Sequence, residues 1–155
     1  MNYLFDTNIV LAFLRRNSVA QMVARILSLT DNNQIYISIV SVGELWSIAR
    51  QNTWSSEKQR QLQHILNDYI QIAVSDTELL IQYADIDAFS QNKLPGRPLN
   101  TTARNMGKND LWRSAVAVVA TASLLGATLL TTDKDFDHLH NQFVDVVRLD
   151  PQTNP

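Results

Sequence analysis

The stretch that decides the fold is MNYLFDTN, residues 1–8, where an apolar run ends in an acid and residues that start helices follow. Residues 2–5 are short and apolar enough for a buried strand, and Asp6 stands at the turn after them. Thr7 and Asn8 supply N-cap chemistry for the apolar helix predicted beyond. A strand that leads straight into a helix indicates the start of an alternating α/β fold.

The same alternation continues along the chain. Further strands are predicted at residues 35–40, 70–74, 127–131 and 143–149. Helices are predicted at residues 19–29, from about Ser41, and at 56–69, 76–89, 109–125 and 136–140. Strands alternating with helices indicate a three-layer α/β/α sandwich with a central, mostly parallel sheet. We expect one domain over residues 1–149 and a C-terminal tail over 150–155.

Composition narrows the class of protein. A chain of 155 residues with 45% hydrophobic content suits one domain that buries roughly 68–70% of its unfolded surface. Its lack of Cys excludes thiolate metal sites, disulfides and cysteine nucleophiles, and it fits a reducing compartment, so we expect a cytoplasmic protein. We expect no signal peptide and no membrane segment, because the apolar runs are too short or interrupted.

Four carboxylates, widely separated in sequence, each stand where a strand ends or a helix begins. They are Asp6, Glu44, Asp110 and Asp133. In an open α/β sheet the carboxyl ends of the strands meet at one crevice, where ligands bind. Acids gathered there repel one another unless a cation neutralises them, and oxygen ligands suit Mg²⁺ or Mn²⁺. The pattern therefore predicts metal-assisted phosphodiester hydrolysis.

Each acid also has a purely structural explanation. Asp6 could belong to a strand-to-helix turn, and Asp133 could cap a helix or lie in a solvated turn. Residues 41–44 read Ser-Val-Gly-Glu, which is a capping box with Glu44 at its third position. Asp110 in the first turn of a helix interacts well with the helix dipole. These explanations are independent of one another, so they do not explain why all four acids stand at strand ends or helix starts. A carboxylate that caps a helix can also bind a metal ion.

A basic stretch precedes the third acid. Residues 91–113 carry five basic residues and one acid, a local charge of +4, although the whole chain is at −2. The basic residues are Lys93, Arg97, Arg104, Lys108 and Arg113. Such a patch beside an acidic site suits an enzyme that cleaves a polyanion, because phosphate contacts supply much of the affinity. The alternative is an ordinary solvated loop with no ligand.

Four motifs in this order resemble the PIN-domain ribonucleases, and most closely the VapC-type toxins. They are DTN at 6–8, SVGEL at 41–45, NDLW at 109–112 and LTTDKDF at 130–136. The resemblance implies that Asp6, Glu44, Asp110 and Asp133 are the four acids of the catalytic site, with the first three on one metal ion. It further implies supporting roles for Asn8, Thr131, Thr132 and Asp135. Asp135 and Asp137 compete with Asp133 for the fourth position, and we prefer Asp133 because it directly follows the strand.

The resemblance implies a Mg²⁺- or Mn²⁺-dependent endoribonuclease that acts as a toxin. Its expected partners are RNA, a small antitoxin that covers the acidic crevice, and a second copy in a homodimer. The first alternative is a PIN fold that binds RNA or protein without cleaving it. A phospho-receiver is less favoured, because Asp6 lacks the acidic neighbour that its site needs. A dehalogenase-like phosphatase is less favoured, because it needs an Asp-x-Asp motif where this chain has Asp6-Thr7-Asn8.

Overall fold

The computed structural model describes residues 1–73, 77–99, 110–150 and 152, with side chains described from residue 113 onward in the third range. A five-stranded sheet in the order β3-β2-β1-β4-β5 forms its centre, and each pairing is parallel. The strands are β1 (Asn2–Phe5), β2 (Gln34–Ser38), β3 (Ile70–Ile72), β4 (Thr128–Thr131) and β5 (Val146–Arg148). The predicted α/β class with a parallel sheet is confirmed.

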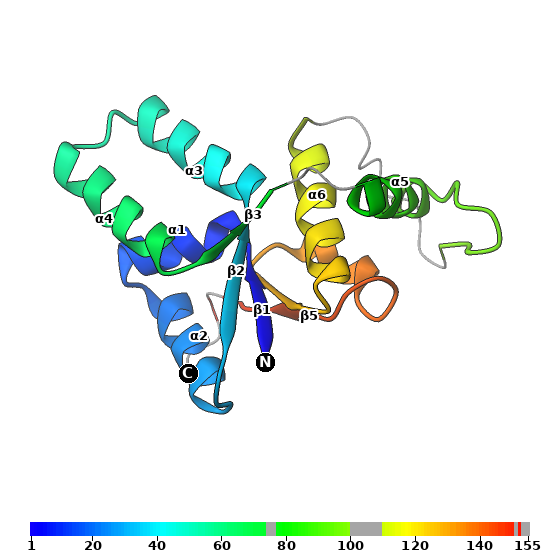
Figure 1. Cartoon of the computed structure of the whole chain (residues 1–155), viewed down its shortest axis with the longest axis horizontal. Coiled ribbons are helices and arrows are strands. Elements are labelled where there is room, and N and C mark those ends of the chain that lie inside the picture. The colour runs from blue at the N-terminus through cyan, green and yellow to red at the C-terminus, as the bar shows by residue number, and fades with distance from the viewer. Residues whose placement is uncertain (74–76, 100–109, 151, 153–155) are drawn as a thin grey trace.

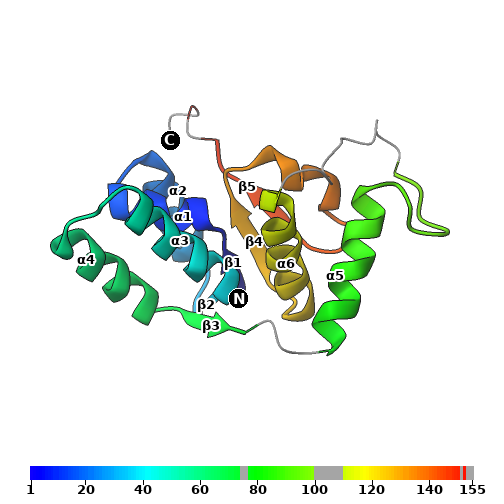
Figure 2. The same ribbon diagram turned by 90° about the horizontal axis from the view of Figure 1, so that it is seen from above.

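Helices cover both faces of this sheet (Figures 1 and 2). On one side lie α1 (Thr7–Arg15), α2 (Ser18–Ser28), α3 (Ile39–Gln51) and α4 (Ser56–Asn67). On the other lie α5 (Thr77–Ser90), α6 (Asp110–Leu124) and the 3₁₀ helix η2 (Lys134–Leu139). The result is the predicted three-layer α/β/α sandwich.

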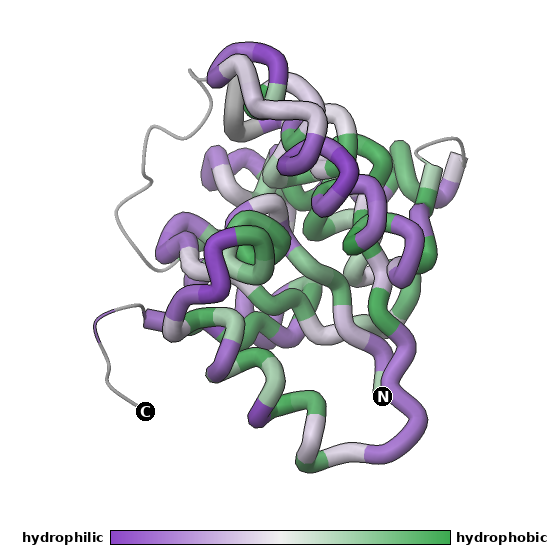
Figure 3. The backbone as a smooth tube through the Cα atoms, turned by 90° about the vertical axis from the view of Figure 1, so that its left-hand side faces the viewer, coloured by the Kyte–Doolittle hydropathy of each residue, from purple (hydrophilic) through white to green (hydrophobic). Residues whose placement is uncertain are grey.

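Side chains of the central strands point alternately to the two faces of the sheet and so divide the apolar core in two. Phe5 of β1 and Leu130 of β4 pack with the helices of the first side, whereas Leu4 and Leu129 pack with those of the second. All four are fully buried. Successive side chains of a strand point to opposite faces, so a strand covered on both faces is apolar throughout. Figure 3 shows these apolar segments in the interior and polar segments on the outer helical turns.

The strand order creates a switch point beside β1. From β1 the chain builds β2 and then β3 on one side, and later places β4 on the opposite side of β1. Helices that leave β1 and β4 therefore diverge to opposite faces, and a crevice opens outside the carboxyl ends of these two strands. Asp6 directly follows β1, and Asp133 follows β4 after one residue.

Two helix starts differ from the prediction. The second strand ends at Ser38, not at residue 40, and α3 begins at Ile39 rather than near Ser41. Ser38 is the N-cap, and its hydroxyl accepts a hydrogen bond from the Val40 backbone N–H at 3.3 Å. At α1 the N-cap is Asp6, so the predicted capping residues that follow it belong to the first helical turn.

The two edge strands are shorter than predicted. β3 covers Ile70–Ile72 instead of residues 70–74, and β5 covers Val146–Arg148 instead of 143–149. Residue 74 lies outside the described residues. Each edge strand has one neighbour, and its pairing to that neighbour spans three residue pairs. The apolar pattern of residues 143–149 thus extends beyond the hydrogen-bonded strand.

Candidate metal and active site

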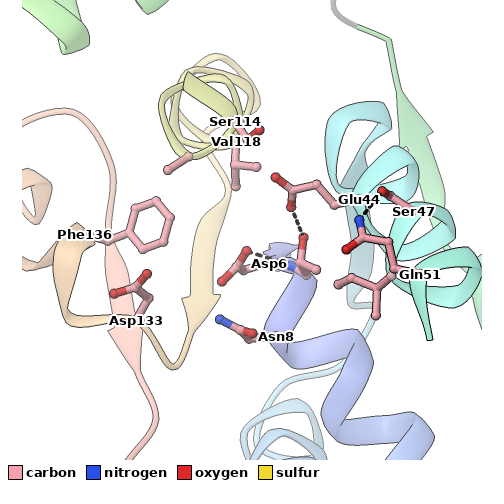
Figure 4. Close-up of a pocket in the computed structure, with 12 residues that line it drawn as sticks. Asp6, Asn8, Glu44, Ser47, Gln51, Ser114, Val118, Asp133 and Phe136 are labelled. Atoms are coloured by element: carbon pink, nitrogen blue, oxygen red, sulfur yellow. Dashed lines mark hydrogen bonds between the residues drawn. The ribbon is translucent and has the colours of Figure 1, made fainter. Parts of the chain in front are cut away.

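A cavity of about 490 Å³ opens at the carboxyl edge of the sheet, beside the β1–β4 pair. Its lining comes from four separate segments of the chain. The lining residues are Asp6, Thr7, Asn8, Glu44, Ser47, Ile48, Gln51, Ser114, Ala115, Val118, Asp133 and Phe136. Figure 4 shows the carboxylates of Asp6, Glu44 and Asp133 directed toward this common space from different elements. The structure therefore brings together three of the four predicted acids.

Asp6 lines the cavity and is 8% exposed. Its Oδ1 accepts a hydrogen bond from the Thr7 backbone N–H at 2.6 Å, and its Oδ2 accepts one from the Thr131 hydroxyl at 2.9 Å. The pKa of the carboxyl is raised from 3.8 to about 6, chiefly by burial. The two hydrogen bonds lower this pKa, and the negative charges of Glu44 and Asp133 raise it further. A cation in the cavity would relieve both the burial penalty and the repulsion.

Thr131 connects the ends of β1 and β4. Its hydroxyl donates to Asp6 Oδ2 and accepts from the Asp133 backbone N–H at 3.0 Å. One hydroxyl can do both, because it has one donor and two acceptor positions. Thr131 is fully buried, so it holds the two acids in a fixed relation. Of the two threonines predicted to orient carboxylates, Thr131 makes these contacts. Neither Thr131 nor Thr132 is among the lining residues.

The structure distinguishes the three acids that compete after β4. Asp133 is the N-cap of η2, its Oδ1 accepts from the Asp135 backbone N–H at 2.9 Å, and it lines the cavity. Asp137 forms an ion pair with Arg148 at 3.0 Å. Neither Asp135 nor Asp137 is among the lining residues. Asp133 is thus both a helix cap and a cavity acid.

Glu44 is no member of a capping box. Because α3 is capped by Ser38, Glu44 is the sixth residue of the helix and cannot reach back to the cap. Its Oε2 instead accepts a hydrogen bond from the Thr7 hydroxyl at 2.6 Å, across 37 residues of sequence. The capping interpretation is therefore wrong for Glu44, and the residue points to the cavity.

Asp110 is the first residue of α6, and its side chain lies outside the described set. The same helix contributes Ser114, Ala115 and Val118 to the lining, and Ser114 follows Asp110 by about one turn. Among the side chains that the structure describes, no three His, Asp or Glu residues are arranged as a metal site. A complete ligand set drawn from the four predicted acids therefore needs Asp110.

Comparison with known proteins decides the family. The model of the PIN domain matches residues 3–141, a span that includes all four acids. The chain belongs to the PIN-domain family. PIN domains are generally nucleases that use divalent metal ions. No curated protein matches the sequence.

Solved structures of low identity share the PIN fold. VapBC2 from Rickettsia felis, bound to a DNA fragment from its promoter, is 19% identical with a TM-score of 0.68, over 95% of this chain and 99% of that chain. VapBC-1 from nontypeable Haemophilus influenzae is 17% identical with a TM-score of 0.68, over 96% and 98%. FitAcB from Neisseria gonorrhoeae is 22% identical with a TM-score of 0.59, over 97% and 98%.

The basic residues of this PIN domain have different surroundings. Lys93 is exposed, and its Nζ donates to Gln91 Oε1 at 3.4 Å. Burial and the charge of Asp87 raise the pKa of Tyr83 of α5, and the charge of Arg113, an exposed residue of α6, opposes that rise. Arg104 and Lys108 lie outside the described residues.

Arg97 is engaged within the protein. Its guanidinium donates to the Gln142 backbone carbonyl at 3.0 Å and to Gln142 Oε1 at 3.3 Å. It also lies 4.4 Å from the centre of the Phe143 ring and 5.5 Å from that of Phe89. These contacts tie the segment after α5 to the segment between η2 and β5. Arg97 therefore has a structural role that its charge did not reveal.

Eight lining residues were not among the predicted site residues. They are Thr7, Ser47, Ile48, Gln51, Ser114, Ala115, Val118 and Phe136. Ser47 and Gln51 follow Glu44 by three and seven positions, a spacing that keeps them on one helical face, so this signal was present in the sequence. Phe136 reads as an ordinary core residue. No helix in the described part of this PIN domain is long and apolar enough to cross a membrane.

Proposed function

We propose that this chain is a Mg²⁺- or Mn²⁺-dependent endoribonuclease and the toxin of a toxin–antitoxin pair. The observation that carries the proposal is the cavity at the β1–β4 edge of a PIN domain, where Asp6, Glu44 and Asp133 converge from distant segments. The proposed nuclease domain is residues 1–149, followed by a tail at 150–155. Its proposed location is the cytoplasm.

The donor set of the cavity fits a hard divalent cation. The described lining residues include three carboxylates and no Lys or Arg that could neutralise them. Oxygen ligands of this kind suit Mg²⁺ and Mn²⁺. Asp6, Glu44 and Asp110 would hold one ion, and Asp133 would position a second ion or the attacking water. A bound ion would supply Lewis acidity toward the phosphate and a more acidic water.

The surrounding side chains keep these acids in place. The Thr131 hydroxyl donates to Asp6 Oδ2 and accepts from the Asp133 backbone N–H, so it would hold Asp6 and the backbone of Asp133 in place while substrate enters. Asn8 is exposed at the cavity, where its amide can orient water or a phosphate oxygen. We keep Thr132 and Asp135 as supporting residues on the strength of the motif resemblance.

RNA is the proposed substrate because the family implies it and a basic stretch leads to Asp110. Lys93, Arg104, Lys108 and Arg113 would contact phosphates and so position the strand without taking part in the chemistry. Arg97 would contribute mainly by holding the stretch in place, because its guanidinium already has partners.

A small antitoxin and a second copy of the chain are the proposed protein partners. Two of the similar structures cited above are VapBC proteins, and another is a toxin–antitoxin complex from Klebsiella pneumoniae, with 20% identity and a TM-score of 0.62. An antitoxin segment that offered Arg or Lys to Asp6 and Glu44 would neutralise the acids in place of metal. Expression without the antitoxin should arrest growth.

A PIN domain that binds without cleaving is the second candidate. Turnover that depends on metal distinguishes the two. A phospho-receiver has no support from the family match.

The experiment is cleavage mapping on total RNA with purified protein, in Mg²⁺, Mn²⁺ or EDTA. We expect defined cuts with metal, none in EDTA, and none with Asp6→Asn. The matched control is Asp31→Asn, which makes the same chemical change at an exposed turn acid far from the cavity lining. Cleavage by Asp6→Asn at the rate of Asp31→Asn, or cleavage that persists in EDTA, would overturn the proposal.

A further inference from the structure

Glu44 needs an external partner to hold its carboxylate over the cavity. It stands in the second turn of α3 and is half-buried at the cavity wall. A glutamate side chain has several freely rotating bonds, and ordering it costs conformational entropy. The capping box that would have fixed it does not form. Some other group must therefore set the direction of its oxygens.

Thr7 supplies that group. Its hydroxyl donates to Glu44 Oε2 at 2.6 Å, a short distance typical of a charge-assisted hydrogen bond (Figure 4, dashed line at Glu44). Thr7 is itself nearly buried as the first residue of α1, and its β-branched side chain is stiff about χ1. The hydroxyl is thus a fixed donor, and it leaves Glu44 Oε1 available to the cavity.

The same residue also holds Asp6. The Thr7 backbone N–H donates to Asp6 Oδ1 at 2.6 Å. A single residue therefore contacts two acids, one through its backbone and one through its side chain. The first contact needs no particular side chain, because any residue except proline has the N–H. The second requires a hydroxyl, and this difference allows the two roles to be separated by substitution.

We propose that Thr7 is a positioning residue for metal binding, whose hydroxyl aims Glu44 at the ion that Asp6 shares. This inference rests on the proposed function. A purely structural role, tying α1 to α3, is the alternative. That tie is not needed for the packing of the two helices, because Val10 and Leu11 of α1 share a buried core with Leu45 of α3.

The test measures Mn²⁺ binding to the full-length protein by titration calorimetry. Thr7→Val keeps the shape of the side chain and removes the donor, and Thr7→Ser restores the donor. We expect Thr7→Val to weaken Mn²⁺ binding by about 10–100-fold, the usual effect of losing a partner of a metal ligand. We expect Thr7→Ser to recover most of that loss.

The Glu44→Ala background isolates the interaction. Without the Glu44 carboxylate, Thr7→Val should cause no further loss of Mn²⁺ affinity if its hydroxyl acts through Glu44. An equal loss in both backgrounds, or failure of Thr7→Val to fold in both, would assign Thr7 a structural role and overturn the inference. Wild-type protein that binds Mn²⁺ and cleaves RNA while Thr7→Val binds equally well would overturn this inference alone. Wild-type protein that neither binds nor cleaves would overturn the proposed function with it.

Discussion

The acidic cavity and the basic stretch after α5 were both predicted from charge, but their charged groups are held differently. In the cavity, Asp6 accepts a hydrogen bond from a residue 125 positions away, yet no described basic side chain lines the space. In the basic stretch, Arg97 is already bound to Gln142 and packed on Phe143. Charges left without a counter-charge beside a cavity point to a ligand, whereas a charge with internal partners points to structure.

The largest expected effect is on Glu44. Because the residue is not part of a capping box, Glu44→Gln should leave stability within about 0.5 kcal/mol of wild type. It should lower single-turnover RNA cleavage by more than about 100-fold, above the usual effect of changing a supporting residue. Thermal unfolding measures the stability, and gel-based cleavage of one RNA measures the cleavage rate. A large loss of stability with unchanged cleavage would return Glu44 to a structural role.

The next effect concerns the pH dependence of folding without metal. The pKa of Asp6 is raised in the folded protein, from 3.8 to about 6. Its contribution to stability is therefore fully present below pH 3.8 and is lost as pH rises through about 6. Above that pH the carboxylate costs up to about 3 kcal/mol, since each pKa unit corresponds to about 1.4 kcal/mol.

The amide of Asp6→Asn does not titrate in this pH range, so in EDTA the variant should be more stable than wild type at pH 7.5. The advantage should shrink as pH falls from 6 to 4. Urea unfolding at several pH values measures the difference, with Asp31→Asn as the control for a general charge effect. An advantage that stays constant with pH would contradict the burial of a charged Asp6.

A smaller effect is expected at Arg97. Arg97→Ala removes hydrogen bonds to Gln142 and the contact with Phe143, and it should destabilise the fold by about 1–2 kcal/mol. Arg97→Lys retains the charge without the planar group and should recover only part of the loss. Denaturant unfolding gives both values. If Arg97→Ala kept full stability but weakened RNA binding, Arg97 would belong with the phosphate contacts.

The smallest effect is expected at Lys93. Its exposed ammonium has one long contact, to Gln91, so it remains available to RNA. Lys93→Gln should leave the stability of the fold unchanged. It should reduce the slope of log K for RNA binding against log salt concentration by about 0.7, the value for one phosphate contact to a single strand. Fluorescence anisotropy over a range of salt concentrations measures this slope. An unchanged slope would make the stretch an ordinary loop.

The sequence predicted the architecture because each layer has a local signal. The run from Asn2 to Phe5 followed by Asp6 reads correctly as strand and turn, since apolar strands covered on both faces are continuous. The end of the second strand was harder to predict. Ile39 and Val40 are β-branched and favour a strand, but Ser38 caps the helix at the last residue pair that β2 shares with β3. The helix cap at Ser38, not strand propensity, marks this boundary.

The site was predicted less completely because its contacts are made in three dimensions. Asp6 and Asp133 could be grouped from strand ends alone. The bond from Thr7 to Glu44 could not, because Thr7 already has an ordinary role at a helix start. The engagement of Arg97 was equally hidden, since its partner Gln142 lies 45 residues further along the chain. Sequence patterns reveal which groups gather at an edge, but not which of them bond.

The proposed function requires that the gathered acids hold a divalent cation. The most direct measurement is a crystal structure of the protein with Mn²⁺, with data collected at a wavelength where manganese scatters anomalously. We expect an anomalous peak in the cavity, in contact with Asp6 and Glu44, that disappears in Asp6→Asn. Crystals that bind no Mn²⁺ in this cavity, or that bind it only elsewhere, would rule out the proposed metal site.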